Sequence, residues 1–179
     1  KLLSLWGKLE MPSRAPPLSR DILVAMAGYA LSKGHLEFAS LLLLGFHCML
    51  RTMELFSLKP EQVLLNNKNV GTLFLGWTKG AKRKGATEIV TLDDNAVGAW
   101  LVKAMKGKLP HERIFAGSIA AFRKLFAECL LQLGLTSHGF MPYSLRRGGA
   151  TVDFATHRHI KRTMERGRWA CGKTSRIYI

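Results

Sequence analysis

The sequence predicts an α+β fold that is mainly α-helical and carries a small antiparallel three-stranded sheet. Long segments with apolar residues at helical spacing make up most of the chain. Three short strand candidates lie one after another in the sequence, separated by turn signals. The 179 residues, 47% of them hydrophobic, are enough for one domain with a hydrophobic core.

The chain divides near its start. Met11–Leu18 holds three prolines, which block helix continuation and are typical of a linker. We interpret residues 1–17 as a linker or the end of an upstream domain, and residues 18–179 as one folded domain.

Two helices are expected next. Ser19 is suited to cap a helix over Asp21–Ser32, and Gly34 is suited to end it. His35–Leu50 is strongly apolar, which predicts a buried helix. This run is too short to span a bilayer and contains His47, so no membrane span is predicted.

The three strands are expected over Gln62–Leu65, Val70–Trp77 and Glu88–Leu92. The last two are joined by the basic segment Thr78–Gly85, whose glycines permit a tight turn. This segment is either a solvated turn or a loop that lies against a phosphate backbone.

Four helices follow, over Asp94–Met105, Ile119–Leu133, Pro142–Ala155 and Ile160–Arg166. Either Asp93 or Asp94 can cap the first of them, Gly134 is suited to end the second, and Gly167 is expected to break the last.

The charge balance points to a polyanionic partner. Lysine and arginine number 27 against 12 acidic residues, which gives a net charge of +15 and a pI near 10.3. Nucleic acid is the leading partner on this ground, and an anionic membrane surface is second.

The three cysteines, Cys48, Cys129 and Cys171, are far apart and form no CxxC pair. This spacing indicates neither a disulfide framework nor a zinc site, and it favours a reducing, intracellular compartment. That compartment is the nucleus in a eukaryote and the cytoplasm in a bacterium, and the sequence does not choose between them.

Residues for metal or nucleotide chemistry are sparse. Neither a GxxxxGK[ST] loop nor a GxGxxG segment after a strand is present. His157 and His159 form an HxH pair without a carboxylate or cysteine nearby in sequence, and Asp93 and Asp94 are adjacent and point apart more readily than they converge. We therefore expect neither a metal nor a cofactor.

A chain with many cationic and few acidic residues can stabilise a phosphate with cationic side chains instead of metal ions. This favours phosphoryl transfer without a metal. Such chemistry needs cations on the non-bridging oxygens, an in-line nucleophile and an acid for the leaving oxygen. Arg51 and Arg146 are candidates for the first role, Tyr178 for the second and Lys79 for the third.

Arg51 and Glu54 leave two interpretations open. Their spacing is that of an exposed salt bridge on a helix. It also suits a functional arginine at the edge of a buried element, held in place by Glu54.

Four segments, in order and spacing, resemble the catalytic domain of the tyrosine recombinases, the phage-integrase family. They are Arg51–Leu55 (RTMEL), Lys79 in its hairpin, Tyr143–Thr151 (YSLRRGGAT), and Gly167–Trp169 (GRW) followed nine residues later by Tyr178. The resemblance runs from about Leu18 to Tyr178. It implies the fold of that domain.

The resemblance also implies site-specific DNA recombination or integration through a 3′-phosphotyrosine intermediate. Tyr178 would be the nucleophile, Arg51 and Arg146 the phosphate clamp, and Lys79 the proton donor. Trp169 would pack in the site and donate through its indole, and Glu54 would orient its surroundings. The sequence departs from the family at Tyr143, which replaces the usual histidine. A phenol, with an ordinary pKa of about 10, is a poor base near neutral pH.

Double-stranded DNA is the implied partner, with self-association to a dimer or tetramer on DNA and no membrane. Residues 1–17 would then be a remnant of an upstream DNA-binding domain. The expected DNA-contacting cations are Lys82, Arg83, Lys84, Arg147, Arg168 and Lys173.

Two alternatives stay open. One is a catalytically impaired DNA-binding remnant of a mobile element, which the substitution at Tyr143 favours. The other is a type IB topoisomerase-like enzyme, which relaxes DNA with the same tyrosine chemistry.

Overall fold

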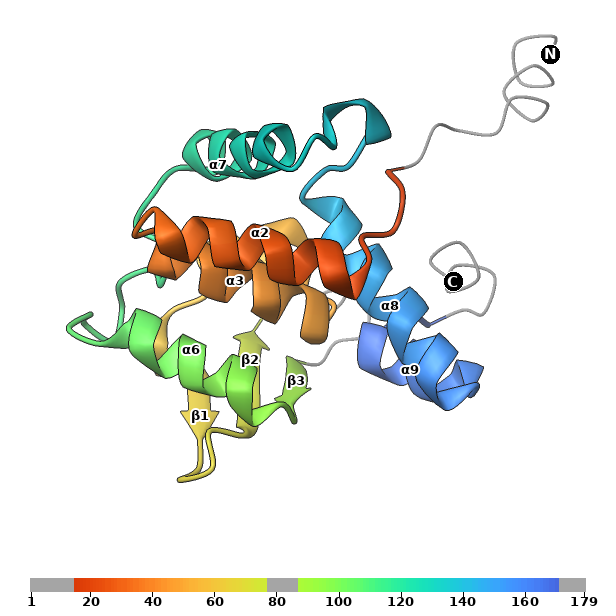
Figure 1. Cartoon of the computed structure of the whole chain (residues 1–179). Helices are drawn as coiled ribbons and strands as arrows, with labels where there is room; N and C mark the ends of the chain where they lie inside the picture. The colour runs from red at the N-terminus through yellow and green to blue at the C-terminus, as the bar shows by residue number, and fades with distance from the viewer. Residues whose placement is uncertain (1–14, 77–86, 171–179) are drawn as a thin grey trace, which may run out of the picture.

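The computed structural model describes residues 15–76 and 87–170. Within these residues the chain forms seven α-helices and one three-stranded sheet (Figure 1). The helices are α2 (Arg20–Ser32), α3 (Leu36–His47), α4 (Thr52–Ser57), α6 (Asn95–Met105), α7 (Ile119–Gln132), α8 (Tyr143–His157) and α9 (Ile160–Gly167). The strands are β1 (Val63–Leu65), β2 (Gly71–Gly76) and β3 (Glu88–Leu92), and two 3₁₀ helices cover Pro60–Gln62 and Thr136–His138. The predicted fold class is confirmed.

Helix α3 is the centre of the molecule and packs against α2, α6 and α8 (Figure 1). Its residues from Phe38 to Phe46 are buried on nearly every side, because neighbours surround the helix and each face needs apolar side chains. Three phenylalanines pack against one another in this core. Phe122 of α7 meets Phe38 and Phe56 edge to face, with ring centroids 4.7 and 4.9 Å apart.

The end of α3 differs from the prediction. The helix stops at His47 rather than at Leu50. Met49 has a φ of 48°, a left-handed conformation that an α-helix cannot continue through. The turn places Arg51 at the N-cap of the short helix α4, where it starts a new element.

The sheet has the order β1-β2-β3 with antiparallel pairing throughout. Leu73 of β2 pairs with Val63 and Val90, and this row faces the core. Phe74 and Ile89 pair on the opposite, exposed face. This alternation of buried and exposed residues has the period of two that is typical of a strand. The predicted strand Glu88–Leu92 is confirmed at both ends.

The remaining helices lie close to their predicted ranges. Asp94 caps α6 by accepting hydrogen bonds from the amides of Ala96 and Val97 at 2.9 and 3.1 Å. Helix α8 runs two residues past the predicted end at Ala155. The predicted break at Gly167 is wrong by one residue, because Gly167 is the last residue of α9 and Arg168 takes the left-handed conformation, with a φ of 58°.

The chain joins the core at Leu18, whose amide donates to the carbonyl of Ser144 at 3.2 Å. Most of the predicted linker, residues 1–14, lies outside the described residues. No helix in the described part of the chain is long and apolar enough to cross a bilayer. Cys48 and Cys129 are buried free thiols, and Cys171 lies outside the described residues.

Candidate functional site

Arg51 is fixed by the helix that it starts. The Glu54 carboxylate accepts the backbone N–H of Arg51 at 2.8 Å through Oε2 and its side-chain Nη1–H at 2.5 Å through Oε1. Glu54 is only 7% exposed, whereas the Arg51 side chain is 31% exposed. Of the two interpretations above, this geometry matches an arginine held at the edge of a buried element.

A second carboxylate contacts the same nitrogen. Glu88, the first residue of β3, lies with Oε2 3.0 Å from Arg51 Nη1 and is 6% exposed. Burial alone would lower the pKa of Arg51, but the hydrogen bonds and negative charges of Glu54 and Glu88 outweigh it and raise the pKa above its ordinary value. Arg51 therefore stays charged.

Arg168 completes an alternating arrangement of four charges. Its Nη2 lies 2.7 Å from Glu54 Oε2, and its Nη1 lies 3.3 Å from Glu88 Oε2. We call Arg51, Glu54, Glu88 and Arg168 the charge ring. They come from the start of α4, the start of β3 and the residue after α9, segments that are far apart in the sequence.

Arg146 lies deeper, in the second turn of α8, and is 2% exposed. Its Nη1 donates to the carbonyl of Met49, and its Nη2 donates to the carbonyl of Gly167 at 2.5 Å. The Met49 carbonyl also accepts Arg168 Nη2 at 3.3 Å. One backbone oxygen thus joins Arg146 to the charge ring.

The ring of Trp169 covers Arg146, with its centroid 4.7 Å from the guanidinium carbon. Trp169 is itself buried. Direct contact between Arg146 and an outside phosphate would require the Gly167–Trp169 turn to move.

The glycine pair after Arg147 lets α8 approach its neighbours. A Cβ at Gly148 would lie 2.1 Å from the carbonyl oxygen of Leu18, and one at Gly149 would lie 2.0 Å from that of Phe46. Side chains there would push α8 off α3 and carry Arg146 away from Met49. The glycines of the YSLRRGGAT segment are packing residues.

Tyr143 is the first residue of α8, one turn before Arg146, and is 38% exposed. Arg147 donates to the carbonyl of Ala15 at 2.7 Å and so holds the start of the described chain. Of the remaining predicted site residues, Lys79, Lys82, Arg83, Lys84, Lys173 and Tyr178 lie outside the described residues.

Arg168 differs from the expectation for a DNA-contacting cation. Its side chain is 7% exposed and faces two carboxylates. The charge of Arg168 is therefore paired inside the protein and is not presented on the surface.

Sequence reasoning missed Glu88. The available signal was an acidic residue that opens a strand directly after a basic hairpin, in a chain with only 12 acidic residues. A lone glutamate at a strand end is usually exposed, so only tertiary structure assigns it to the site.

It also missed a neighbouring network around Arg166 of α9. Arg166 Nη1 lies 2.7 Å from Asp93 Oδ2, and His47 Nε2 lies 2.6 Å from Asp93 Oδ1. Arg166 Nη2 donates to the carbonyl of His47 at 3.2 Å. The network fastens α9 to the end of α3 and to the residue after β3. It shares no residue with the charge ring.

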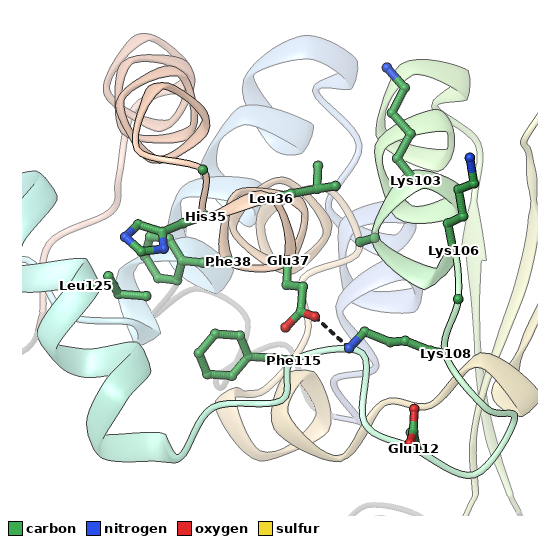
Figure 2. A pocket seen from close by; sticks show the side chains of 13 residues that line it. His35, Leu36, Glu37, Phe38, Lys103, Lys106, Lys108, Glu112, Phe115 and Leu125 are labelled. Carbon is green, nitrogen blue, oxygen red and sulfur yellow. Dashed lines mark ion pairs between the residues drawn. The ribbon is translucent and has the colours of Figure 1, made fainter.

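A cavity of about 520 Å³ lies elsewhere, between the start of α3, the end of α6 and the segment before α7 (Figure 2). Lys108 Nζ reaches across it to Glu37 Oε1 at 2.6 Å, while Lys103 and Lys106 point outward (Figure 2). None of the site residues described above lines this cavity. No group of three or more His, Cys, Asp or Glu residues suited to a metal occurs within residues 15–76 and 87–170.

Comparison with known proteins finds the likeness in structure rather than in sequence. No family model matches the chain, and no curated protein matches it. The structure is similar to the XerH site-specific recombinase bound to its difH substrate in a pre-cleavage complex, with a TM-score of 0.72 and 18% identity over 92% of this chain. It is similar to the XerA recombinase, with a TM-score of 0.70 and 18% identity over 94% of this chain.

A post-cleavage complex of XerH on a palindromic difH substrate matches equally well, with a TM-score of 0.72 and 18% identity over 93% of this chain. The chain covers 50% of the XerH chains and 60% of the XerA chain, so it spans little more than half the length of these proteins. The fold that the four sequence segments predicted is confirmed.

Proposed function

We propose that this chain, which has the fold of the tyrosine recombinase catalytic domain, cleaves and rejoins DNA in site-specific recombination. The observation that carries the proposal is the hydrogen bonding of the Arg51 guanidinium. Two buried carboxylates fix this half-buried arginine through Nη1, and no described residue accepts a hydrogen bond from its Nη2 or Nε. That edge of the guanidinium suits a phosphate, which takes two parallel hydrogen bonds from arginine.

The reaction has two balanced steps. The Tyr178 phenol gives up its proton as its oxygen attacks a backbone phosphorus, the bond to the 5′ oxygen breaks, and that oxygen takes a proton to leave as a 5′-hydroxyl. A 5′-hydroxyl from another strand then attacks the 3′-phosphotyrosine and releases the phenol. Each step exchanges one phosphoester bond for another, so the proposal needs neither a nucleotide cofactor nor a metal.

The predicted residues divide the work. Arg51 binds the non-bridging oxygens, and Lys79 protonates the leaving 5′ oxygen. Arg146 adds a buried positive charge and holds the turn that carries Trp169, since its nitrogens bind the carbonyls of Met49 and Gly167. Tyr143 donates a hydrogen bond from the first turn of α8.

Partners follow from the same proposal. Both XerH complexes contain DNA substrate, and a net charge of +15 suits a DNA duplex. Strand exchange between two duplexes requires several protomers, so we expect self-association to a dimer or tetramer on DNA. Residues 1–17 fit the end of an upstream DNA-binding domain.

Two observations favour a second candidate, a DNA-binding remnant without chemistry. Tyr143 stands where the family has a histidine, and Arg146 is covered by Trp169. A protein in this state would keep its charge and bind duplexes in a salt-dependent way without cutting them.

Trapping of a covalent adduct separates the candidates. The chain is incubated with duplex oligonucleotides of randomised sequence that carry a nick, so that the cleaved end diffuses away and the protein stays attached. Denaturing gels and peptide mass spectrometry then report the attachment site. An adduct at Tyr178 that disappears in Tyr178→Phe supports the proposal. Salt-sensitive binding without adduct from any sequence supports the remnant, and relaxation of supercoiled plasmid without strand exchange supports a topoisomerase.

A further inference from the structure

We propose that Arg168 and Glu88 are positioning residues that keep one edge of Arg51 open for phosphate. This inference rests on the proposed function and deepens it. It assigns a positioning role at the same site to Arg168 and Glu88, which are not among the catalytic residues that the family resemblance implies. Neither residue needs to touch DNA.

Only one nitrogen of the Arg51 guanidinium contacts the carboxylates of the ring. Glu54 and Glu88 both reach Arg51 through Nη1, at 2.5 and 3.0 Å. Arg168 binds the same two carboxylates, at 2.7 Å from Glu54 and 3.3 Å from Glu88. Arg168 thus helps Arg51 to pair with both carboxylates, and no other cation belongs to the ring.

Within the charge ring, the charges balance only with Arg168 present. The ring contains two guanidinium groups and two carboxylates, all but Arg51 at most 7% exposed. Buried charges need partners, because water does not solvate them. Without Arg168, the two buried carboxylates of the ring share a single ring cation, Arg51. Arg51 is then drawn inward to serve both, and the site repels a phosphate.

The ring also joins residues that lie close in sequence to two of the predicted catalytic residues, Lys79 and Trp169. Glu88 begins β3 two residues after Ala86, where the segment that contains Lys79 ends. Arg168 immediately precedes Trp169. By joining both to Arg51, the ring fixes the base of the hairpin and the Gly167–Trp169 turn against the start of α4.

The backbone conformation of Arg168 also supports a positioning role for its side chain. Its φ of 58° is a conformation that favours glycine, and side chains adopt it at a cost. The contacts of the guanidinium with two carboxylates, together with the Met49 carbonyl at 3.3 Å, offset that cost.

Arg166 offers a matched control. It lies two residues earlier at the same helix end and binds Asp93 at 2.7 Å, outside the charge ring. Arg166→Met removes a partly buried arginine and its ion pairs with Asp93 and Asp153 but leaves the balance around Arg51 intact.

The experiment combines cleavage rates with a direct probe of Arg51. Adduct formation on the nicked duplexes is timed for wild type, Arg168→Met, Glu88→Gln, the double variant Arg168→Met with Glu88→Gln, and Arg166→Met. In parallel, ¹⁵N spectra of the arginine side chains follow the Arg51 guanidinium, assigned by its loss in Arg51→Lys. Melting temperatures show which variants are folded.

We expect Arg168→Met to slow cleavage by about 100-fold, as a misplaced binding group does, and to shift the Arg51 signals. Arg166→Met should slow cleavage less than about 3-fold and leave these signals in place. Adding Glu88→Gln to Arg168→Met should restore about 10-fold of the lost rate, because one carboxylate then faces one guanidinium. Loss of packing alone would give no such rescue.

Unchanged Arg51 signals in a folded Arg168→Met variant, or the same rate loss in Arg166→Met, would overturn the inference. If Arg168→Met does not fold, Arg168→Lys and Glu88→Gln decide by the same spectra, since each roughly keeps the side-chain volume and weakens the ion pairs that this residue makes in the ring. Absence of any adduct in wild type, with the spectra changing as expected, would sink the proposed function while the positioning of Arg51 stands.

Discussion

The guanidinium of Arg146 lies 4.7 Å from the ring centroid of Trp169, although the two residues belong to different sequence motifs. Arg146 sits in α8 and Trp169 follows α9. Their contact shows that the YSLRRGGAT and GRW segments form one structural unit at the end of α3.

Arg146→Ala should abolish adduct formation and lower the free energy of unfolding by about 3 kcal/mol. The loss follows because the carbonyls of Met49 and Gly167 lose a buried donor, and each such group costs about 1–3 kcal/mol. Urea unfolding and the adduct assay measure both effects. DNA affinity should fall only mildly, because the buried charge acts mainly as charge builds up in the reaction. Arg123→Ala, at an exposed position of α7, is the control.

Gly149→Ala should destabilise the protein by about 1–3 kcal/mol, as overpacking does in cores. Its Cβ would lie 2.0 Å from the backbone oxygen of Phe46, which cannot swing aside as a side chain can. Gly28→Ala in α2 is a matched control, because a Cβ there meets nothing within 4 Å. We expect that variant to be more stable by about 0.5–1 kcal/mol. Thermal melts that rank the two variants the other way would contradict the packing role.

Lys79→Ala should slow cleavage selectively, and a substrate with a 5′-thiol leaving group should restore the rate. A thiolate leaves without a proton, so the missing acid no longer matters. Lys82→Ala and Lys84→Ala, in the same hairpin, are the controls and should gain nothing from the sulfur substrate. If one of them is rescued and Lys79→Ala is not, the acid is that lysine.

Tyr143→His should raise the cleavage rate near pH 7 by about 10-fold. Imidazole has an ordinary pKa of about 6.5 and accepts a proton at neutral pH, which a phenol does poorly. The rate profile of the variant should gain a step near that pH. A variant that binds DNA as wild type does, yet cleaves no faster, would exclude proton removal as the role of this position.

Asp93→Asn should destabilise the protein at neutral pH and have little effect in strong acid. Partial burial alone would raise the pKa of Asp93, but the hydrogen bond and charge of Arg166, helped by His47, lower it to about 2. A depressed pKa stabilises the fold above the unfolded value near 3.8, and this contribution fades as the pH falls through about 2. The effect is small, because solvent screens a half-exposed carboxylate. Urea unfolding at pH 7 and at pH 2 should therefore differ in the gap between wild type and variant.

The local elements were predictable because their signals are local. The apolar spacing of α7, the cap at Asp94 and the short strand β3 each depend on residues that are close together in the sequence. The ends of α3 and α9 were misplaced, because Met49 and Arg168 adopt left-handed backbone that tertiary contacts stabilise against their own preference.

The sequence alone determined the fold class, the charge that suits DNA and the order of the arginine, lysine and tyrosine segments, since each is written in composition or short spacing. Only the tertiary structure decided that Glu88 and Arg168 lie beside Arg51 and Glu54. A buried charge depends on which partners the folded chain brings within about 3–4 Å, and that distance is a property of packing between segments far apart along the chain.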